Sequence, residues 1–97
     1  MGKRDRLSGD EIAGFVAAHP GWAQTGERIE RSYSFPDYGA SVGFVMRVAL
    51  LAERRDHHPD IELSWGKVRV AWSTHDAGGL TALDLELAEL TDRLSAG

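Results

Sequence analysis

Residues 56–81 read DHHPDIELSWGKVRVAWSTHDAGGLT, and this stretch decides the fold. Apolar and polar residues alternate between 61 and 72, which predicts two strands, and Gly66 in the middle predicts a hairpin turn. We expect one row of each strand to face the core: Ile61, Leu63 and Trp65 on the first, and Val68, Val70 and Trp72 on the second. Because a hairpin returns to its starting edge, His75 is expected close to His57 and His58.

The first and last helices are marked by their starting residues. Ser8 and Glu11 have the spacing of a capping box, in which each side chain bonds a free backbone N–H of the first turn. The helix that begins there should end at Pro20. Thr81 and Asp84 repeat the same spacing and predict a helix to the end of the chain.

The longest helix is expected over residues 37–55. Its apolar residues recur at spacings of three and four and form a wide stripe: Tyr38, Val42, Val45, Ala49 and Ala52, flanked by Phe44, Val48 and Leu51. A stripe of this width predicts a central helix buried against a sheet.

Two more strands are expected between the first two helices. Residues 27–35 alternate, although Arg31 interrupts the inward row and suggests an edge position or an exposed end. A short partner strand is expected over 22–25, joined through a turn at Gly26.

These elements give the order helix, two strands, helix, two strands, helix. Short connections favour antiparallel pairing, and helices on one face of such a sheet make a two-layer α+β domain. We expect a flexible tail over residues 1–6 and a single domain over 7–97. A domain of this size has a modest core, so oligomerisation would add stability.

Composition excludes several classes of function. The net charge of −4 argues against nucleic-acid binding. The absence of cysteine removes disulfides, thiolate nucleophiles and thiolate metal sites, and it fits a reducing cytoplasm. The basic start lacks the apolar run of a signal peptide, and no segment is long and apolar enough to span a membrane.

The histidine cluster allows several interpretations. The histidines could be loop residues without chemistry, or they could join Asp76 in a metal site, although helical His spacing is absent. Ser73 and Thr74 do not resemble a nucleophile elbow, and the glycine pair lacks the lysine of a phosphate loop. General acid–base chemistry on a small molecule fits best, since imidazoles gain and lose protons near neutral pH.

The combined pattern resembles the pterin-4a-carbinolamine dehydratase family. The resemblance extends from Leu7 to the last helix and rests on Asp56-His57-His58-Pro59, Trp65-Gly66-Lys67-Val68, and Ser73 to Thr81 with Asp84. It implies an α+β fold with a four-stranded antiparallel sheet and three helices on one face. It also implies a cofactor-independent lyase that dehydrates 4a-hydroxytetrahydropterin to quinonoid dihydropterin, recycling the pterin of aromatic amino acid hydroxylases.

The resemblance also assigns residues. It implies a catalytic set of His57, His58 and His75, with His58 as the main acid–base group. The implied substrate contacts are these histidines with Pro59, Thr74, Asp76 and Ala77, and the supporting acidic residues are Glu53, Asp56 and Asp84. No metal is implied.

Two positions depart from the family pattern, and the roles of family members leave a second function open. Trp65-Gly66 stands where the family commonly has Tyr-Asn, and Ile61 where many animal members have an aromatic residue. Family members form dimers or tetramers, and some animal members also bind a transcription factor. The alternative function is therefore a binding or regulatory module without turnover, although three intact histidines favour the enzyme.

Overall fold

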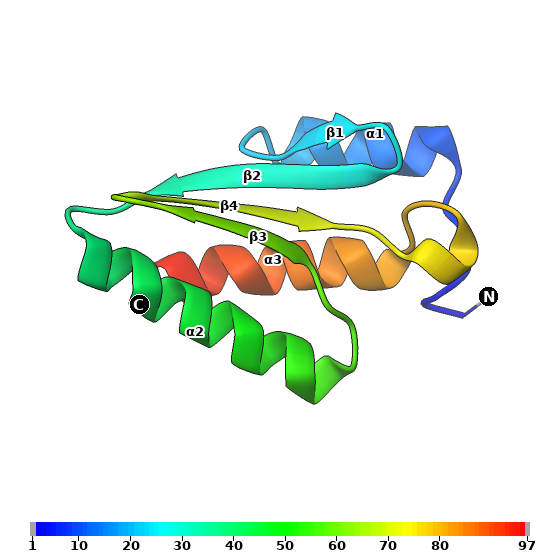
Figure 1. The fold of residues 1–97 in the computed structure, drawn as a ribbon. Helices are drawn as coiled ribbons and strands as arrows, with labels where there is room; N and C mark the ends of the chain where they lie inside the picture. The colour runs from blue at the N-terminus through cyan, green and yellow to red at the C-terminus, as the bar shows by residue number, and fades with distance from the viewer. Residues whose placement is uncertain (1, 97) are drawn as a thin grey trace.

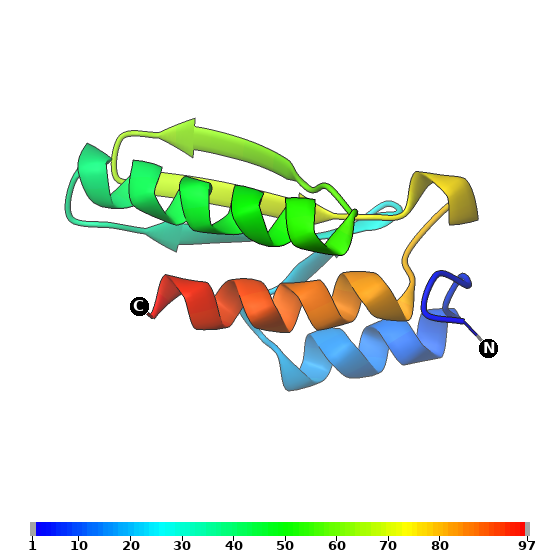
Figure 2. The same cartoon turned by 90° about the horizontal axis from the view of Figure 1, so that it is seen from below.

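The computed structural model describes residues 2–96 as a two-layer α+β domain (Figures 1 and 2). Its elements are α1 (Gly9–Ala18), β1 (Ala23–Thr25), β2 (Arg28–Ser34), α2 (Tyr38–Arg55), β3 (Asp60–Ser64), β4 (Lys67–Trp72), a 3-10 turn η1 (His75–Ala77) and α3 (Ala82–Ser95). The predicted order is confirmed, and the short strand β1 is present. Figure 2 shows the three helices side by side on one face of the sheet, with α3 between α2 and α1. None of the helices in residues 2–96 is long and apolar enough to cross a membrane.

The sheet is antiparallel throughout, with strand order β1-β2-β4-β3. The β3–β4 hairpin turns through Trp65 and Gly66, because Ser64 pairs directly with Lys67. Gly66 has a φ of 69°, and an added Cβ would lie 3.1 Å from the carbonyl oxygen of Phe35. Glycine suits this turn for both reasons.

The predicted capping boxes are both formed. The Ser8 and Glu11 side chains bond each other's backbone N–H at the start of α1, and Thr81 and Asp84 do so at the start of α3. Asp37 caps α2 by accepting from the Ala40 N–H at 2.7 Å. Local chemistry therefore sets where each helix begins.

The hairpin faces the core less completely than predicted. Val68, Val70 and Trp72 of β4 are fully buried, as expected. Leu63 is 36% exposed and Trp65 is 71% exposed, so the prediction that the whole first row faces the core is wrong. β3 is an edge strand with a neighbour on one side only, and the helical layer leaves its end near the turn uncovered.

The apolar stripe of α2 divides into a buried and an uncovered side. Phe44, Val48 and Leu51 are buried against the sheet. Tyr38 is 49% exposed and Ala49 is also exposed. The predicted packing against the sheet is confirmed, but the prediction of a central helix is wrong, because α3 is the middle helix of the layer. The stripe is wider than the surface that one sheet and one neighbouring helix can cover.

Arg31 lies in the middle of a central strand, so both expected alternatives, an edge position and an exposed strand end, are wrong. β2 lies between β1 and β4, and Arg31 Nη1 lies 3.1 Å from Asp92 Oδ1 of α3. The Tyr33 hydroxyl donates to the same carboxylate at 2.5 Å. Burial, reinforced by this bond to Asp92, raises the pKa of Tyr33 above its usual value. The charge of Arg31 is tolerated in this inward row because Asp92 of α3, which packs on the same face of the sheet, pairs with it.

Candidate active site

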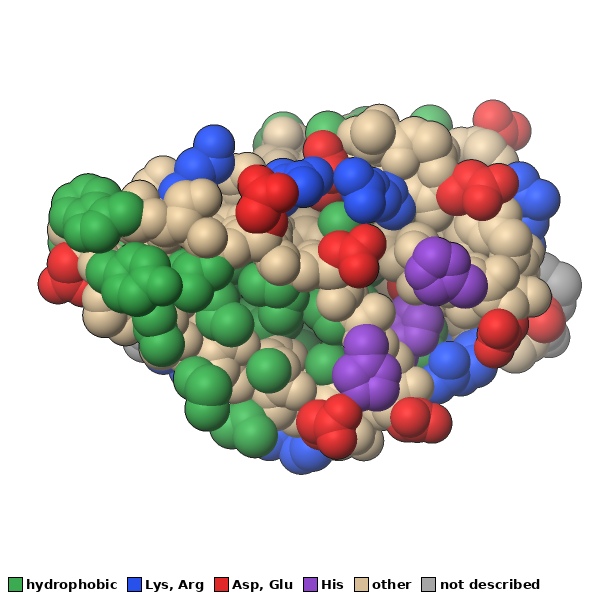
Figure 3. Space-filling model, in the orientation of Figure 1, with side chains coloured by type: hydrophobic (Ala, Val, Ile, Leu, Met, Phe, Trp, Pro, Cys, Tyr) green, Lys and Arg blue, Asp and Glu red, His purple; other side chains and the backbone are tan. Residues whose placement is uncertain are grey.

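The hairpin brings three histidines to one end of the sheet, as predicted. His57 and His58 lie between the end of α2 and the start of β3, and His75 begins η1 just beyond β4. They line a depression of about 270 Å³ together with Arg4, Asp56, Ser73, Thr74 and Asp76. Figure 3 shows histidine and acidic side chains gathered on this face.

The two adjacent histidines follow Asp56, the residue that ends α2, and they lie in different surroundings. Asp56 has the left-handed conformation, with φ 50° and ψ 45°, and non-glycine residues adopt this conformation rarely. After it, the His57 side chain is buried and the His58 side chain is 58% exposed. Two identical neighbours therefore occupy different chemical environments.

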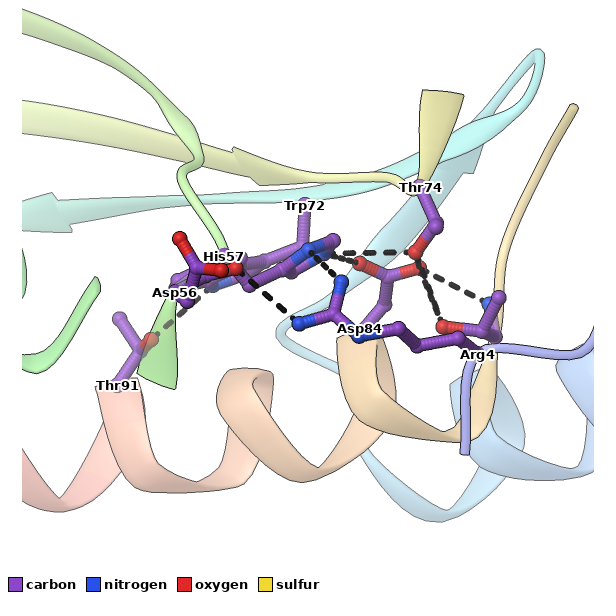
Figure 4. A network of polar contacts seen from close by, with 8 residues as sticks. Arg4, Asp56, His57, Trp72, Thr74, Asp84 and Thr91 are labelled. Carbon is purple, nitrogen blue, oxygen red and sulfur yellow. Dashed lines mark hydrogen bonds and ion pairs between the residues drawn. The ribbon is translucent and has the colours of Figure 1, made fainter. Parts of the chain in front are cut away.

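His57 is held by polar groups at both ring nitrogens (Figure 4). Its Nε2 lies 2.6 Å from Asp84 Oδ1, and Arg4 Nη1 donates to its Nδ1 at 3.4 Å. The ring also stacks on Trp72, with centroids 5.9 Å apart and planes 9° apart. Trp72 is fixed in turn by a 3.1 Å bond from its Nε1 to Thr91.

Asp84 supports this histidine from a fully buried position. Its Oδ2 accepts from Thr74 Oγ1 at 2.8 Å and from the Thr81 N–H at 2.9 Å, and the Thr81 hydroxyl approaches at 3.3 Å. One carboxylate thus caps α3 and anchors the His57 ring. Buried charge is stabilised only when its hydrogen bonds are satisfied in this way.

His58 is open to solvent and has an acidic partner. Its Nε2 lies 2.6 Å from Glu53 Oε1, which projects from the last turn of α2. The other ring nitrogen, Nδ1, takes no part in this contact. An imidazole oriented by a carboxylate and accessible from outside has the form of a proton-transfer group.

His75 is presented at the tip of a closed loop. Thr74 and Gly79 bond each other's backbone groups at 3.1 and 3.3 Å, and Gly78 turns the chain with a φ of 71°. His75 and Asp76 are exposed on this loop. A second depression, of about 320 Å³, shares Ser73, Thr74 and His75 with the first and extends toward β1.

Two residues predicted as substrate contacts do not line the depression, and two residues that line it were not predicted. Pro59 and Ala77 are half-buried neighbours of its lining, not part of it. Arg4 and Ser73 line it but were not predicted as site residues. Ser73 could have been inferred from its position after a strand, whereas no local pattern marks Arg4.

The chain is similar to known proteins over most of its length. The model of the family "Pterin 4 alpha carbinolamine dehydratase" matches residues 5–94. The chain is 42% identical to a protein of Thermosynechococcus vestitus named after pterin-4-alpha-carbinolamine dehydratase, over 94% of this chain and 96% of the relative. It is 45% identical to a protein of the same name from a Bradyrhizobium strain, over 95% of both chains.

A solved structure has the same fold. The transcriptional coactivator/pterin dehydratase of Brucella melitensis superposes with a TM-score of 0.88 at 33% identity, covering 94% of this chain and 99% of that one. The similarity therefore spans both the helical layer and the sheet end that carries the histidines.

Proposed function

The chain belongs to the pterin-4-alpha-carbinolamine dehydratase family, and from that premise we propose that it dehydrates 4a-hydroxytetrahydropterin to quinonoid dihydropterin. The observation that carries the proposal is the convergence of two exposed histidines and one buried histidine on a single depression. Its volume of about 270 Å³ lies near the lower end of small-molecule sites, which suits a bicyclic pterin.

The reaction requires two proton transfers. The C4a–O bond breaks when the hydroxyl receives a proton and leaves as water, and N5 loses its proton as the N5–C4a double bond forms. One imidazolium and one neutral imidazole can perform both transfers, each contributing about 10²- to 10⁴-fold. We assign these transfers to His58 and His75 jointly, because both side chains are exposed and line the same depression.

The remaining residues have supporting roles in this proposal. Both ring nitrogens of His57 are occupied by Asp84 and Arg4, so His57 shapes the site and positions its neighbours. Glu53 orients His58 through the 2.6 Å contact. Asp56, Thr74 and Asp76 supply polar groups for the pterin from the lining, and Pro59 and Ala77 fix the two segments beside it.

Stopped-flow absorbance tests the proposal directly. An aromatic amino acid hydroxylase supplies the 4a-hydroxypterin, and its decay is followed with wild type, His58→Ala and His75→Ala. We expect His58→Ala to lower kcat about 10²-fold or more. His19→Ala is the matched control, because His19 stacks on Phe15 in α1 at 4.0 Å and lies outside the depression. A folded wild-type protein without acceleration would favour the binding-module alternative.

We also propose that the protein acts as a homodimer or homotetramer in the cytoplasm, in the pathway of an aromatic amino acid hydroxylase. The support is an uncovered apolar surface on α2 and the hairpin, visible at the left of Figure 3, that includes Tyr38, Met46, Leu50, Leu63 and Trp65. Contiguous apolar surface of this kind marks association sites. Light scattering after gel filtration tests this, with Leu50→Glu expected to give monomers.

A further inference from the structure

Arg4 reaches the histidine depression from the segment that precedes α1 (Figure 4). Its guanidinium forks: Nη1 donates to His57 Nδ1 at 3.4 Å, and Nη2 donates to the Asp56 carbonyl at 3.1 Å. The backbone is pinned on both sides of Arg4, since the Leu83 N–H donates to the Lys3 carbonyl at 3.0 Å and the Leu7 N–H to the Leu80 carbonyl at 2.8 Å. The segment is therefore held where Arg4 can reach both groups.

These contacts fix the tautomer of His57. A guanidinium has donors and no acceptor, so the Nδ1 atom that faces Arg4 must accept and carry no proton. The ring proton then lies on Nε2, where Asp84 Oδ1 accepts it at 2.6 Å. Thr74 does not compete for that oxygen, because its hydroxyl donates to Asp84 Oδ2 at 2.8 Å. His57 is thus held between a donor and an acceptor.

We propose that Arg4 is a positioning residue of the site: Asp84 holds one ring proton of His57 on Nε2, and Arg4 keeps a second proton off Nδ1, so that proton transfer is left to His58 and His75. The catalytic part of this inference rests on the proposed dehydratase function, whereas the tautomer part does not. Arg4 also brings a permanent positive charge to a depression otherwise lined by the carboxyl groups of Asp56 and Asp76.

Long-range ¹H–¹⁵N NMR of the histidine rings tests the tautomer at a single neutral pH. In wild type, His57 should show an unprotonated Nδ1 and a protonated Nε2. Arg4→Met removes the donors and should move the Nδ1 shift toward the protonated form, because Asp84 still holds the other proton on Nε2, whereas Arg4→Lys should restore part of the wild-type pattern. Lys3→Met is the matched control, because Lys3 lies in the same segment but pairs with Glu86 at 3.1 Å outside the depression.

Kinetics provide the second readout. We expect Arg4→Met to lower kcat about tenfold, as loss of orientation does, with a smaller change in KM. An unchanged His57 spectrum in Arg4→Met would overturn the proposal even if kcat fell, because Arg4 would then act by another route. An equal loss in Lys3→Met would also overturn it. If wild type shows no dehydration, the dehydratase function fails, but the NMR comparison still decides the role of Arg4.

Discussion

Asp84→Asn should destabilise the fold strongly although the side chain keeps its shape. An amide nitrogen at the Oδ1 position would face His57 Nε2, and at Oδ2 it would face the Thr74 and Thr81 donors. His57 cannot change tautomer to accept from the amide, because Nδ1 would then present its proton to Arg4. A hydrogen bond to a charged acceptor contributes about 1.5–3 kcal/mol and one to a neutral acceptor about 0.5–1.5 kcal/mol. The substitution loses the bond from His57 and weakens the bonds from Thr74 and Thr81. We therefore expect a loss of about 3–5 kcal/mol.

Urea unfolding followed by circular dichroism at fixed protein concentration measures this loss. With a slope of about 1.5 kcal/mol/M, the midpoint should fall by about 2–3 M. Asp76→Asn is the control, because this exposed carboxylate lies in η1, shortly before α3, and its substitution should change stability by less than about 0.5 kcal/mol. An Asp84→Asn midpoint within about 0.5 M of wild type would refute the view that this carboxylate anchors both α3 and His57.

Three further predictions follow from single contacts. Glu53→Gln should lower kcat several-fold, because it weakens the 2.6 Å contact to His58, yet it should change the unfolding free energy by less than about 1 kcal/mol because both groups are exposed; a stopped-flow rate equal to wild type would exclude an orienting role. Burial and the bond to Asp92 raise the pKa of Tyr33 in the folded state, so its contribution to the free energy of unfolding is complete well below pH 10. This contribution is lost as the pH rises, by about 1.4 kcal/mol at pH 11. Tyr33→Phe should remove this part of the alkaline loss in urea unfolding, and an equal dependence of stability on pH in both proteins would contradict the prediction. Gly66→Ala should lower thermal stability by about 1–2 kcal/mol because of its positive φ and the close carbonyl, and an unchanged melting temperature would show that the turn can relax.

The sequence predicted the elements and the meeting of the histidines because both depend on local chemistry. Capping residues mark where α1 and α3 begin, and a two-residue turn at Gly66 forces β4 to return beside β3. Once the hairpin closes, His75 has to lie near His57. Alternation, however, identifies two faces of a strand without showing how much of each is covered. For this reason Trp65 was expected inside and is 71% exposed.

Other unpredicted features depend on partners distant in sequence. Arg31 was expected at an edge or an exposed strand end because a charge interrupts the inward row. Its partner, Asp92, lies in the last helix, too distant in sequence for the pattern to reveal it. Arg4 was overlooked because its contact joins the start of the chain to His57, and no motif links the two positions. Asp84 was expected as a capping residue and as a supporting acid, but only the folded geometry shows that the same carboxylate does both.

This double use of Asp84 has a consequence for comparing relatives. Its contact with the Thr81 N–H serves the start of α3 whether or not the site is active. On the proposed function, a lineage that exchanged turnover for a binding role could replace the exposed His58 and His75, while loss of Asp84 would still remove a bond at the start of α3. We therefore expect the aspartate to persist in relatives that have lost the two exposed imidazoles.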